Sequence, residues 1–503
     1  MKVFLNQLLI KPYFILLCFV VIALISYFPT LQIGYISDDW GFVYQLEHYG
    51  WQAFLQNFTD KFFIPVSHVI GTIQYYITGG NPIIQHIIQV IIHAIVSWQI
   101  FLLFRDISIK KSKKELVQVG IVAGILFLIN PFNVESVAWL ASKSYGYTLF
   151  LSLLALRILL KEEQSTKNYI LFFSFTFIAI HCKEWAYMLP FIAICIVRIL
   201  QIKIKPSFYI GVFLTIGISL ALRYIALGSV IGGYENAQSL NLGVVIIHSI
   251  AYVIKFLSFW RFSGGESFSL IVPGTFVLVF LIFLIKYVLI NKTSKLEMRP
   301  LLFFLCIILF SLLPIAGLEM SSFDTSQSDR YSYFALVPFS IIYAFVILYF
   351  KTYMRYFTLT LFVFLFIAFS FKYVTLWKHA SEVQYTFLEK LHDNVNTNER
   401  VLLYNVPDTY QNIYCMRNGI EPFLKVHGKI VDIEVFQRQD FLMKNGGILR
   451  INDSIFNPTH AKNTYTTFPK GTITENRIQF DYTWLKEFNK TLIYSNETFT
   501  TLK

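Results

Sequence analysis

Charged residues are scarce in this chain. Only 14% of its 503 residues are Asp, Glu, Lys or Arg, whereas 55% are hydrophobic, and the mean hydropathy is +0.56. A soluble protein of this length needs more charged surface to cover its core, which excludes an ordinary soluble fold. Apolar stretches of about 18 residues or more, long enough to span a membrane, recur between residues 12 and 373. We therefore expect a multi-pass membrane protein.

Acidic residues are fewer than basic ones, 30 against 42, so the formal net charge is +12. Such a charge can indicate nucleic-acid binding. Here the Lys and Arg residues cluster in short loops between apolar runs, where positive charge sets the orientation of membrane helices. We therefore predict no nucleic-acid partner.

The chain also lacks a cysteine framework, internal repeats and low-complexity tracts. Four of its five cysteines lie in or beside apolar runs, and Cys415 stands alone beyond them. This pattern predicts no network of disulfides. The missing repeats count against a transporter built from two related halves.

Basic loops predict the topology, because cytoplasmic loops are enriched in Lys and Arg. The strongest is "RDISIKKSKKE", residues 105–115. Residues 66–80 and 242–260 resemble membrane spans. If either segment crossed the membrane, a basic loop that follows it would lie on the extracytoplasmic side, so we predict that both lie along the outer membrane–water interface. The result is about 11 spans with a cytoplasmic N-terminus. The other loops assigned to the cytoplasm are 161–167, 198–205, 286–299 and 351–355.

The expected architecture has two domains. Residues 1–378 form an all-α transmembrane bundle with a first outer loop at about 32–82. Residues 379–503 form a small β-rich or α+β extracytoplasmic domain. This tail opens with an amphipathic pattern, "SEVQYTFLEKLHDNV", and continues with strand-like runs such as "RVLLYN" and "NRIQFDY".

Ionisable residues collect on the predicted outer face. Asp38 and Asp39 follow the first span in "GYISDDWGF", and Lys183-Glu184 interrupts an apolar stretch. Charge within a membrane costs about 2.5–3.5 kcal/mol at a helix centre, so such residues indicate function. Carboxylates and cations beside lipid suit a substrate with a lipid tail and an anionic head. The other candidates are Glu135, Lys143, Asp329, Arg330, Tyr331, His86 and His93.

Each candidate also has a structural interpretation. The acidic pair could end a helix and face water, Glu135 could be a solvated loop residue, and Lys183-Glu184 could pair with itself. Arg330 could pair with Asp329. His86 and His93 are seven residues apart on one helix face, where packing and a hydrogen bond are favoured over metal ligation.

The motifs "SDDW", "GGNPIIQHIIQVIIHAIVSWQIFLLF", "INPFNVESVAWLASK", "CKEWAYMLP" and "SDRYSYFALVP" occur in this order. Together they resemble the membrane half of the transmembrane-and-TPR O-mannosyltransferases and their bacterial relatives, which belong to the GT-C superfamily of glycosyltransferases. The resemblance covers about residues 10–350 and includes no TPR array. It implies an acidic pair in the first outer loop, a polyprenyl-phosphate sugar donor and transfer outside the cytoplasm. Matched by position, these features fall on Asp38-Asp39, His86, His93, Glu135, Lys183-Glu184 and Asp329-Arg330-Tyr331, with Lys143 where the family has Arg.

We accordingly predict an integral-membrane hexosyltransferase of a bacterial inner membrane. Asp38, with Asp39 beside it, is the expected general base for an acceptor hydroxyl on a protein or glycan. Lys183, Arg330 and Lys143 are the expected ligands of the donor phosphate. No cofactor is assigned; a divalent cation at the acidic pair stays open because a third ligand is lacking. A lipid-linked-sugar flippase or other transporter and a glycan polymerase or ligase are the alternatives.

Overall fold

A computed structural model of the chain describes most of the predicted bundle and parts of the tail. The predicted span and basic loop within residues 259–297 and most of the outer loop 318–331 lie outside the described residues. The described residues are 11–53, 62–113, 115–161, 165–230, 241–258, 298–318, 328–411, 413–416, 418–439, 449–451, 454–456, 471–474, 477–480, 488–495 and 498–501.

The described part of the chain before residue 395 is helical. Its α-helices are α2 (Pro12–Ser26), α3 (Asp38–Tyr49), α5 (Pro65–Ile77), α6 (Pro82–Lys111), α7 (Glu115–Leu128), α8 (Val134–Ala138), α9 (Lys143–Leu159), α10 (Thr166–Ile180), α11 (Leu189–Ile199), α12 (Pro206–Leu227), α13 (Leu242–Ser258), α15 (Met298–Ala316), α16 (Leu336–Tyr349) and α17 (Thr352–Asn394). Short 3₁₀ helices connect several of them: η1 (Phe28–Gln32), η2 (Gly50–Gln52), η3 (Pro131–Asn133), η4 (Leu140–Ser142), η5 (Glu184–Met188) and η7 (Asp329–Ser332).

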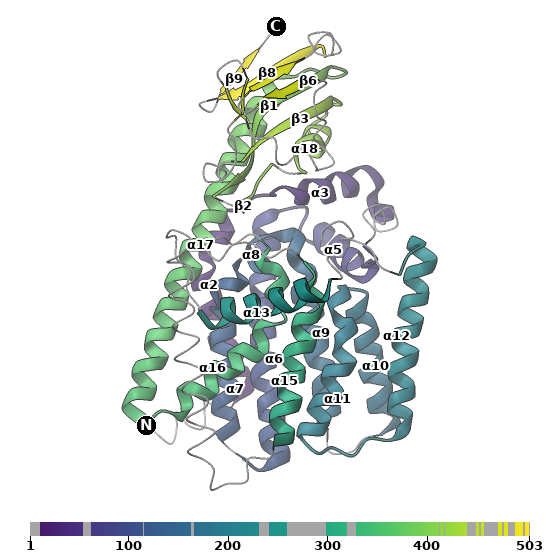
Figure 1. The fold of residues 1–503 in the computed structure, drawn as a ribbon, viewed down its shortest axis with the longest axis vertical. Coiled ribbons are helices and arrows are strands. Elements are labelled where there is room, and N and C mark those ends of the chain that lie inside the picture. Colours follow the sequence, from purple (N-terminus) through teal and green to yellow (C-terminus); the bar gives the residue numbers. More distant parts are fainter. Residues whose placement is uncertain are drawn as a thin grey trace.

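The long helices stand side by side as a bundle, with the strands of the tail stacked on one end (Figure 1). Helix α6 packs against α2, α7 and α9, which makes it the centre of the bundle. Helix α13 lies across the bundle instead of along it, and α3 and α5 lie at the end that faces the tail (Figure 1).

Three of the described helices are long and apolar enough to cross a membrane: α6, α12 and α17. Helix α7 makes a fourth candidate together with residues 131–138, to which it is joined at a 53° bend. Apolar helices of 10–17 residues add to these, among them α2, α10 and α16. The count of about 11 spans therefore stays a prediction.

Helix α6 begins and ends with signals that are visible in its sequence. Asn81 caps its start, because the side-chain oxygen accepts hydrogen bonds from the backbone N–H of Ile83 and Ile84, and Pro82 is its first residue. At its other end, the ammonium group of Lys110 donates to the Leu160 carbonyl, directly after α9. The ammonium group of Lys111 donates to the Leu200 carbonyl, directly after α11, at 2.7 Å. The helix therefore extends well into the loop predicted for residues 105–115.

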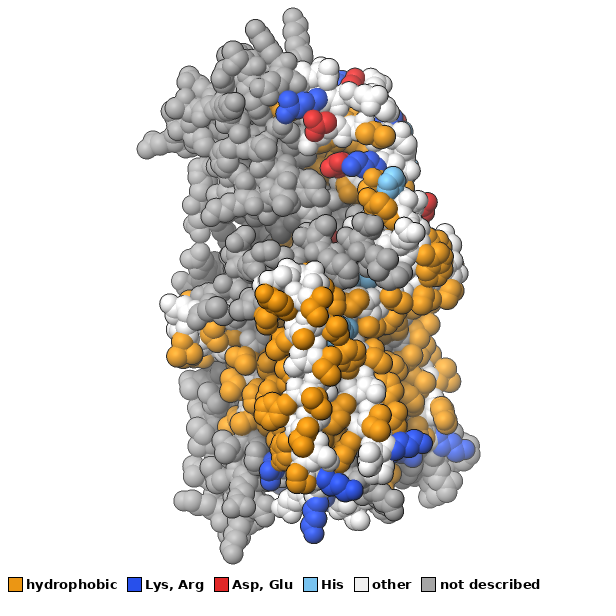
Figure 2. Space-filling model, turned by 90° about the vertical axis from the view of Figure 1, so that its right-hand side faces the viewer, with side chains coloured by type: hydrophobic (Ala, Val, Ile, Leu, Met, Phe, Trp, Pro, Cys, Tyr) orange, Lys and Arg blue, Asp and Glu red, His pale blue; other side chains and the backbone are white. Residues whose placement is uncertain are grey.

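The side chains are distributed as a membrane protein requires. The face in Figure 2 has a broad apolar band over the bundle, Lys and Arg side chains at its lower edge, and mixed charges at the end that carries the tail. The basic edge matches the predicted cytoplasmic side.

The last helix joins the bundle to the tail without a break. The predicted span and the predicted amphipathic helix 381–395 form one helix, α17, of 43 residues. Its second half buries Trp377, Gln384 and Leu388 among other residues. The predicted boundary at 379–398 therefore falls largely within a continuous helix, and the first strand begins at Arg400.

The described residues of the tail form two sheets and a short helix, α18 (Ile420–Val426). The first sheet has the order β2-β1-β8-β9, with β3 also paired to β1, and the second has the order β5-β4-β7-β6. Strand β1 runs parallel to β3 and β8, and it is buried on both faces: Val401 and Leu403 on one face and Leu402 on the other are all buried. The strands are β1 (Arg400–Tyr410), β2 (Ile413–Tyr414), β3 (Asp432–Gln439), β4 (Leu449–Ile451), β5 (Ser454–Phe456), β6 (Gly471–Thr474), β7 (Arg477–Phe480), β8 (Lys490–Ser495) and β9 (Thr498–Thr501).

Candidate active site

The segment before the acidic pair is held in a strained conformation. Ser37 has φ 51° and ψ −113°, a region that residues with a Cβ rarely adopt. Its backbone N–H donates to Gln384 Oε1 of α17 at 2.8 Å, and the Gln384 amide donates to the Tyr35 carbonyl at 2.9 Å. The long helix thus fixes the turn that presents the two carboxylates.

Asp38 and Asp39 begin helix α3, and their surroundings differ. Asp38 is half-buried, whereas Asp39 is 4% exposed and accepts the backbone N–H of Ile36 at 2.9 Å. Burial raises the pKa of Asp39 to about 7, against the lowering effects of its backbone hydrogen bonds and of Lys143. The pair therefore starts a helix, with one carboxyl group buried and the other accessible. The interpretation in which both end a helix and face water is wrong.

Lys143 lies beneath the acidic pair, at the start of α9. The residue is 8% exposed, its ammonium group is 4.1 Å from the centre of the Phe42 ring, and it acts electrostatically on Asp39. Gly71 of α5 leaves it room, since a Cβ there would come within 2.8 Å of the lysine Cε and Nζ. Lys143 thus joins α3, α5 and α9 at the site.

Lys183 and Glu184 lie between α10 and α11, and they pair with each other at 3.6 Å, as the structural interpretation expects. Glu184 is also bonded to Arg223 of α12, with 3.0 Å between Arg223 Nη1 and the carboxylate. Burial is the largest single effect on the Glu184 carboxyl group, and it raises the pKa. Lys183, a backbone hydrogen bond and Arg223 together outweigh burial, so the pKa of Glu184 is lowered. The ionised Glu184 therefore lies between two cations.

The two charged residues of the "DRY" motif, Asp329 and Arg330, pair with different partners. Arg330 does not pair with Asp329, as one interpretation held, but with Glu135, at 2.6 Å between Nη1 and Oε1. The Arg330 backbone N–H donates to the same carboxylate at 2.7 Å. Glu135 is therefore a fully buried ion-pair partner, and its interpretation as a solvated loop residue is wrong.

Asp329 pairs with a residue outside the predicted site. Its Oδ1 is 2.9 Å from the Nζ of Lys255 on α13, and both side chains are 1% exposed or less. Removing two ions from water costs free energy, which their mutual attraction offsets, so breaking such a pair by removing one partner is strongly destabilising. Adjacent residues of η7 thus bind oppositely charged partners on α8 and α13.

Ring contacts and electrostatics connect these charges into one site. The ammonium group of Lys183 is 5.4 Å from the centre of the Tyr145 ring, which contacts the ring of Tyr331. The guanidinium of Arg330 is 4.5 Å from the centre of that Tyr331 ring. His68 of α5 also interacts with these charges. Burial, which is the largest effect, and the nearby positive charges of Lys143 and Lys183 together lower its pKa to about 4.

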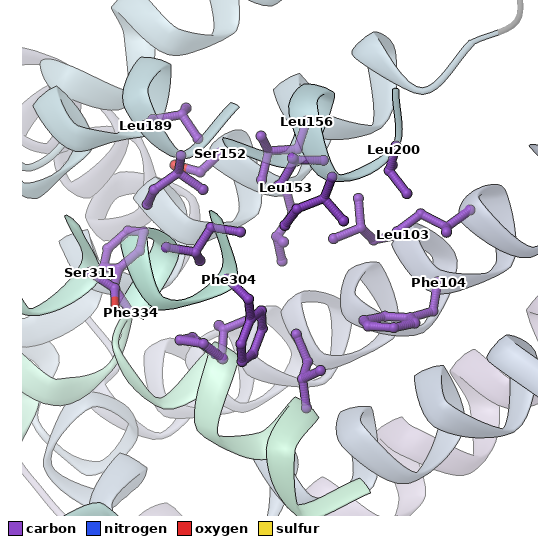
Figure 3. A pocket seen from close by; sticks show the side chains of 18 of the residues that line it. Leu103, Phe104, Ser152, Leu153, Leu156, Leu189, Leu200, Phe304, Ser311 and Phe334 are labelled. Atoms are coloured by element: carbon purple, nitrogen blue, oxygen red, sulfur yellow. The ribbon is translucent and has the colours of Figure 1, made fainter. Parts of the chain in front are cut away.

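An apolar cavity of about 440 Å³ lies inside the bundle. One end of it is lined by Trp185 and Phe334, whose rings stack with centroids 3.5 Å apart. Trp185 is two positions after Lys183 in the sequence and Phe334 is four positions after Arg330, so these rings link the cavity to the charged layer. The cavity continues between α6, α9, α11 and α15, where apolar side chains surround it (Figure 3). Lys111 and Lys113 line its opposite end.

The two histidines lie on α6. His93 is buried and hydrogen-bonded to Tyr333 Oη at 2.7 Å and to the Leu128 carbonyl at 2.9 Å, contacts that suit the packing interpretation. His86 is also buried. Within the described residues, no group of three or more His, Cys, Asp and Glu side chains could hold a metal ion.

Sequence reasoning missed four residues of this site: Arg223, Lys255, His68 and Asn418. His68 and Lys255 belong to the segments 66–80 and 242–260, which are predicted from the sequence to lie along the outer interface. Arg223 carried a usable signal, because an arginine inside an apolar run of α12 needs a buried partner. Asn418 of the tail, which donates to Asp38 Oδ1 at 2.5 Å, had none.

No family model matches the chain, and no curated protein matches it. Among solved structures it is similar to ArnT from Cupriavidus metallidurans bound to undecaprenyl phosphate, with a TM-score of 0.49 and 10% identity over 83% of this chain and 85% of that chain. The apo state of ArnT gives 0.44 and 9% over the same shares. The Archaeoglobus fulgidus oligosaccharyltransferase, solved with zinc and sulfate, gives 0.40 and 12% over 86% of this chain and 63% of that chain.

Proposed function

We propose that this protein is a membrane glycosyltransferase that moves a sugar from a polyprenyl-phosphate donor to an acceptor hydroxyl on the extracytoplasmic side. One observation carries the proposal: a cluster of carboxylates and cations adjoins Trp185 and Phe334, which line an apolar cavity inside the bundle. The cavity would hold isoprene units of the donor, and the charged cluster would hold its sugar phosphate.

The phosphate would lie between Lys183 and Arg330, with Lys143 nearer the acidic pair. In this part of the described structure, the three cations Lys183, Arg223 and Arg330 pair with two carboxylates, Glu135 and Glu184, while Lys143 lies beside Asp39. The three cations thus exceed their two carboxylates by one positive charge, which suits a phosphodiester that gains charge as its sugar leaves. We propose Glu135, Glu184 and Asp329 as residues that position these cations, with Tyr331 between them.

The reaction follows from this placement. Asp38, the accessible carboxylate, accepts the proton of the acceptor hydroxyl. The hydroxyl oxygen attacks the anomeric carbon opposite the phosphate, and a new C–O bond forms. The bond between that carbon and the phosphate oxygen breaks, and polyprenyl phosphate leaves with the electron pair. Asp39 is the organiser of the turn, because it is buried and bonded to the backbone of Ile36.

The finer assignments belong to the same proposal. The sugar is a hexose, the acceptor is a protein or a glycan, and the membrane is the inner membrane of a bacterium. A divalent cation held by Asp38 and Asp39 is the untested alternative role of the pair.

Donor binding tests the proposal with undecaprenyl phosphate as the probe and undecaprenol as its phosphate-free match. The wild-type protein should bind the phosphate form much more tightly, and Lys183→Met should remove most of that preference. Lys203→Met, an exposed lysine between α11 and α12, is the matched control and should bind like the wild type. Equal affinity of the wild type for both lipids would overturn the phosphate site.

A further inference from the structure

The tail domain contacts the acidic pair directly. Helix α18 packs on α3, and Trp40 meets Phe423 edge to face, with ring centroids 4.9 Å apart. Gly419 allows this approach, because a Cβ on it would lie 2.8 Å from the Ser37 carbonyl oxygen. The backbone of the tail is thus pressed against the strained turn that carries the carboxylates.

One side chain of the tail reaches the accessible carboxylate. The Asn418 amide donates to Asp38 Oδ1 with 2.5 Å between nitrogen and oxygen, and the contact is partly buried. The Ser37 hydroxyl lies 3.4 Å from the same oxygen. A donor on one oxygen fixes the plane of the carboxyl group, and the other oxygen then has a defined direction toward an incoming hydroxyl.

We propose that Asn418 is a positioning residue that orients Asp38 for proton abstraction, so that the active site is completed by the tail domain. This inference rests on the proposed function, because it assigns Asp38 as the base. It gives the tail a role in turnover as well as in stability. A hydrogen bond to a charged group changes a rate by about tenfold or more when it is lost.

Three substitutions of Asn418 distinguish a role in orienting Asp38 from a role in packing. Asn418→Asp keeps the shape of the side chain but replaces the donor with a second negative charge. Asn418→Ala removes both the donor and the packing, and Asn418→Gln keeps a donor on a longer arm.

We expect turnover to fall in the order wild type, Asn418→Gln, Asn418→Ala, Asn418→Asp, with the last at least tenfold below wild type. The KM for the lipid donor and the thermal midpoint should change little. The matched control is Glu421→Gln, which removes a charge from α18 at its partly exposed pair with Lys425. This variant should turn over like the wild type.

A packing role would instead make Asn418→Asp better tolerated than Asn418→Ala, and that order would overturn the inference. Asp38→Asn is measured in parallel. If it retains wild-type turnover, the proposed base is wrong. If it is inactive while Asn418→Asp is fully active, only the positioning role is wrong.

Discussion

At the scale of single residues, the two neighbouring carboxyl groups have different chemistry because the fold treats them differently. Asp39 lies within the protein with backbone donors around it, and burial raises its pKa from 3.8 to about 7. Asp38 stays accessible at the mouth of the site. An accessible base beside a buried organiser is the division of labour that the proposed reaction needs.

The raised pKa of Asp39 predicts how stability depends on pH. Between about pH 4 and about pH 7 the folded state keeps a proton that the unfolded chain has released, so rising pH weakens the fold across this window. Asp39→Asn has no proton to lose. Its thermal midpoint relative to wild type should therefore rise with pH from 4 to 7 and then level off, as measured by thermal unfolding in detergent. Asp38→Asn is the control, and a difference between Asp39→Asn and wild type that is constant at every pH would contradict the prediction.

Because Arg330 is paired with buried Glu135, we predict that replacing Arg330 lowers the stability of the fold. A residue that only binds substrate would not have this effect. Arg330→Met leaves the carboxylate of Glu135 buried without its cation, which typically costs about 3–5 kcal/mol. The double variant Arg330→Met with Glu135→Gln should recover much of this loss in denaturant or thermal unfolding, because no buried charge is left. If the double variant were no more stable than the single one, the pair would not contribute to stability in this way.

The sequence identified most of these residues but not their partners. Asp38, Glu135, Lys183 and Arg330 stood out because charge is rare in so apolar a chain. Which charges meet depends on how distant segments pack, so neither the Arg330–Glu135 pair nor the link from Asp329 to Lys255 could be derived. The same holds for Asn418, an ordinary loop residue that matters only through the docking of the tail.

At the scale of elements, the apolar cavity and the helix that closes the bundle determine the site. The cavity is lined by α6, α9, α11 and α15 and runs from the charged layer toward Lys111 and Lys113. An isoprenoid chain in this space would be shielded from bulk lipid. The length of α17, in turn, ties the strained turn at Ser37 to the tail.

Filling the cavity tests its role. Leu153 of α9 lines it, so Leu153→Trp should reduce its free volume and weaken binding of undecaprenyl phosphate by at least tenfold while the protein stays folded. Ile170→Trp on the exposed face of α10 is the matched control, since that side chain is 60% exposed. Binding that survives in Leu153→Trp would place the lipid chain elsewhere.

The helices of the bundle were easier to predict than their ends. Apolar runs and the Asn81-Pro82 start of α6 are local signals, because a capping Asn followed by Pro marks a helix start within the sequence itself. The continuation of α6 through "RDISIKK" and of α17 beyond Trp377 depends on neighbouring helices, because polar residues there are stabilised by contacts such as the bond from Lys111 to the Leu200 carbonyl. The cavity has no sequence signal at all, since most of its lining residues are ordinary apolar side chains of helices far apart in the sequence, among them α6, α9, α11, α15 and α16.

At the scale of the whole molecule, the protein has a basic end, an apolar middle and a tail-bearing end with the charged site (Figures 1 and 2). This order matches a protein with its basic end in the cytoplasm and its site outside. The tail covers α3 through α18, so under the proposed function it would form part of the entrance for the acceptor.

Cysteine labelling of intact cells tests this orientation. A membrane-impermeant maleimide should label Thr397→Cys at the start of the tail and should label Ser112→Cys after α6 only when the membrane is opened. Both side chains are exposed, so access to the thiol depends on the compartment alone. The unsubstituted protein, with its five natural cysteines, is the control. Labelling of Ser112→Cys alone in intact cells would reverse the topology and remove the site from the outer face.

The most direct test of the central claim is the turnover of Asp38→Asn with its donor binding measured on the same preparation. The substitution keeps size and polarity but removes the group that accepts the proton. We predict that turnover falls by about two to four orders of magnitude while the affinity for undecaprenyl phosphate is unchanged, because the lost interaction acts in the transition state. Sugar transfer at the wild-type rate by this variant, and by the double variant with Asp39→Asn, would contradict the account.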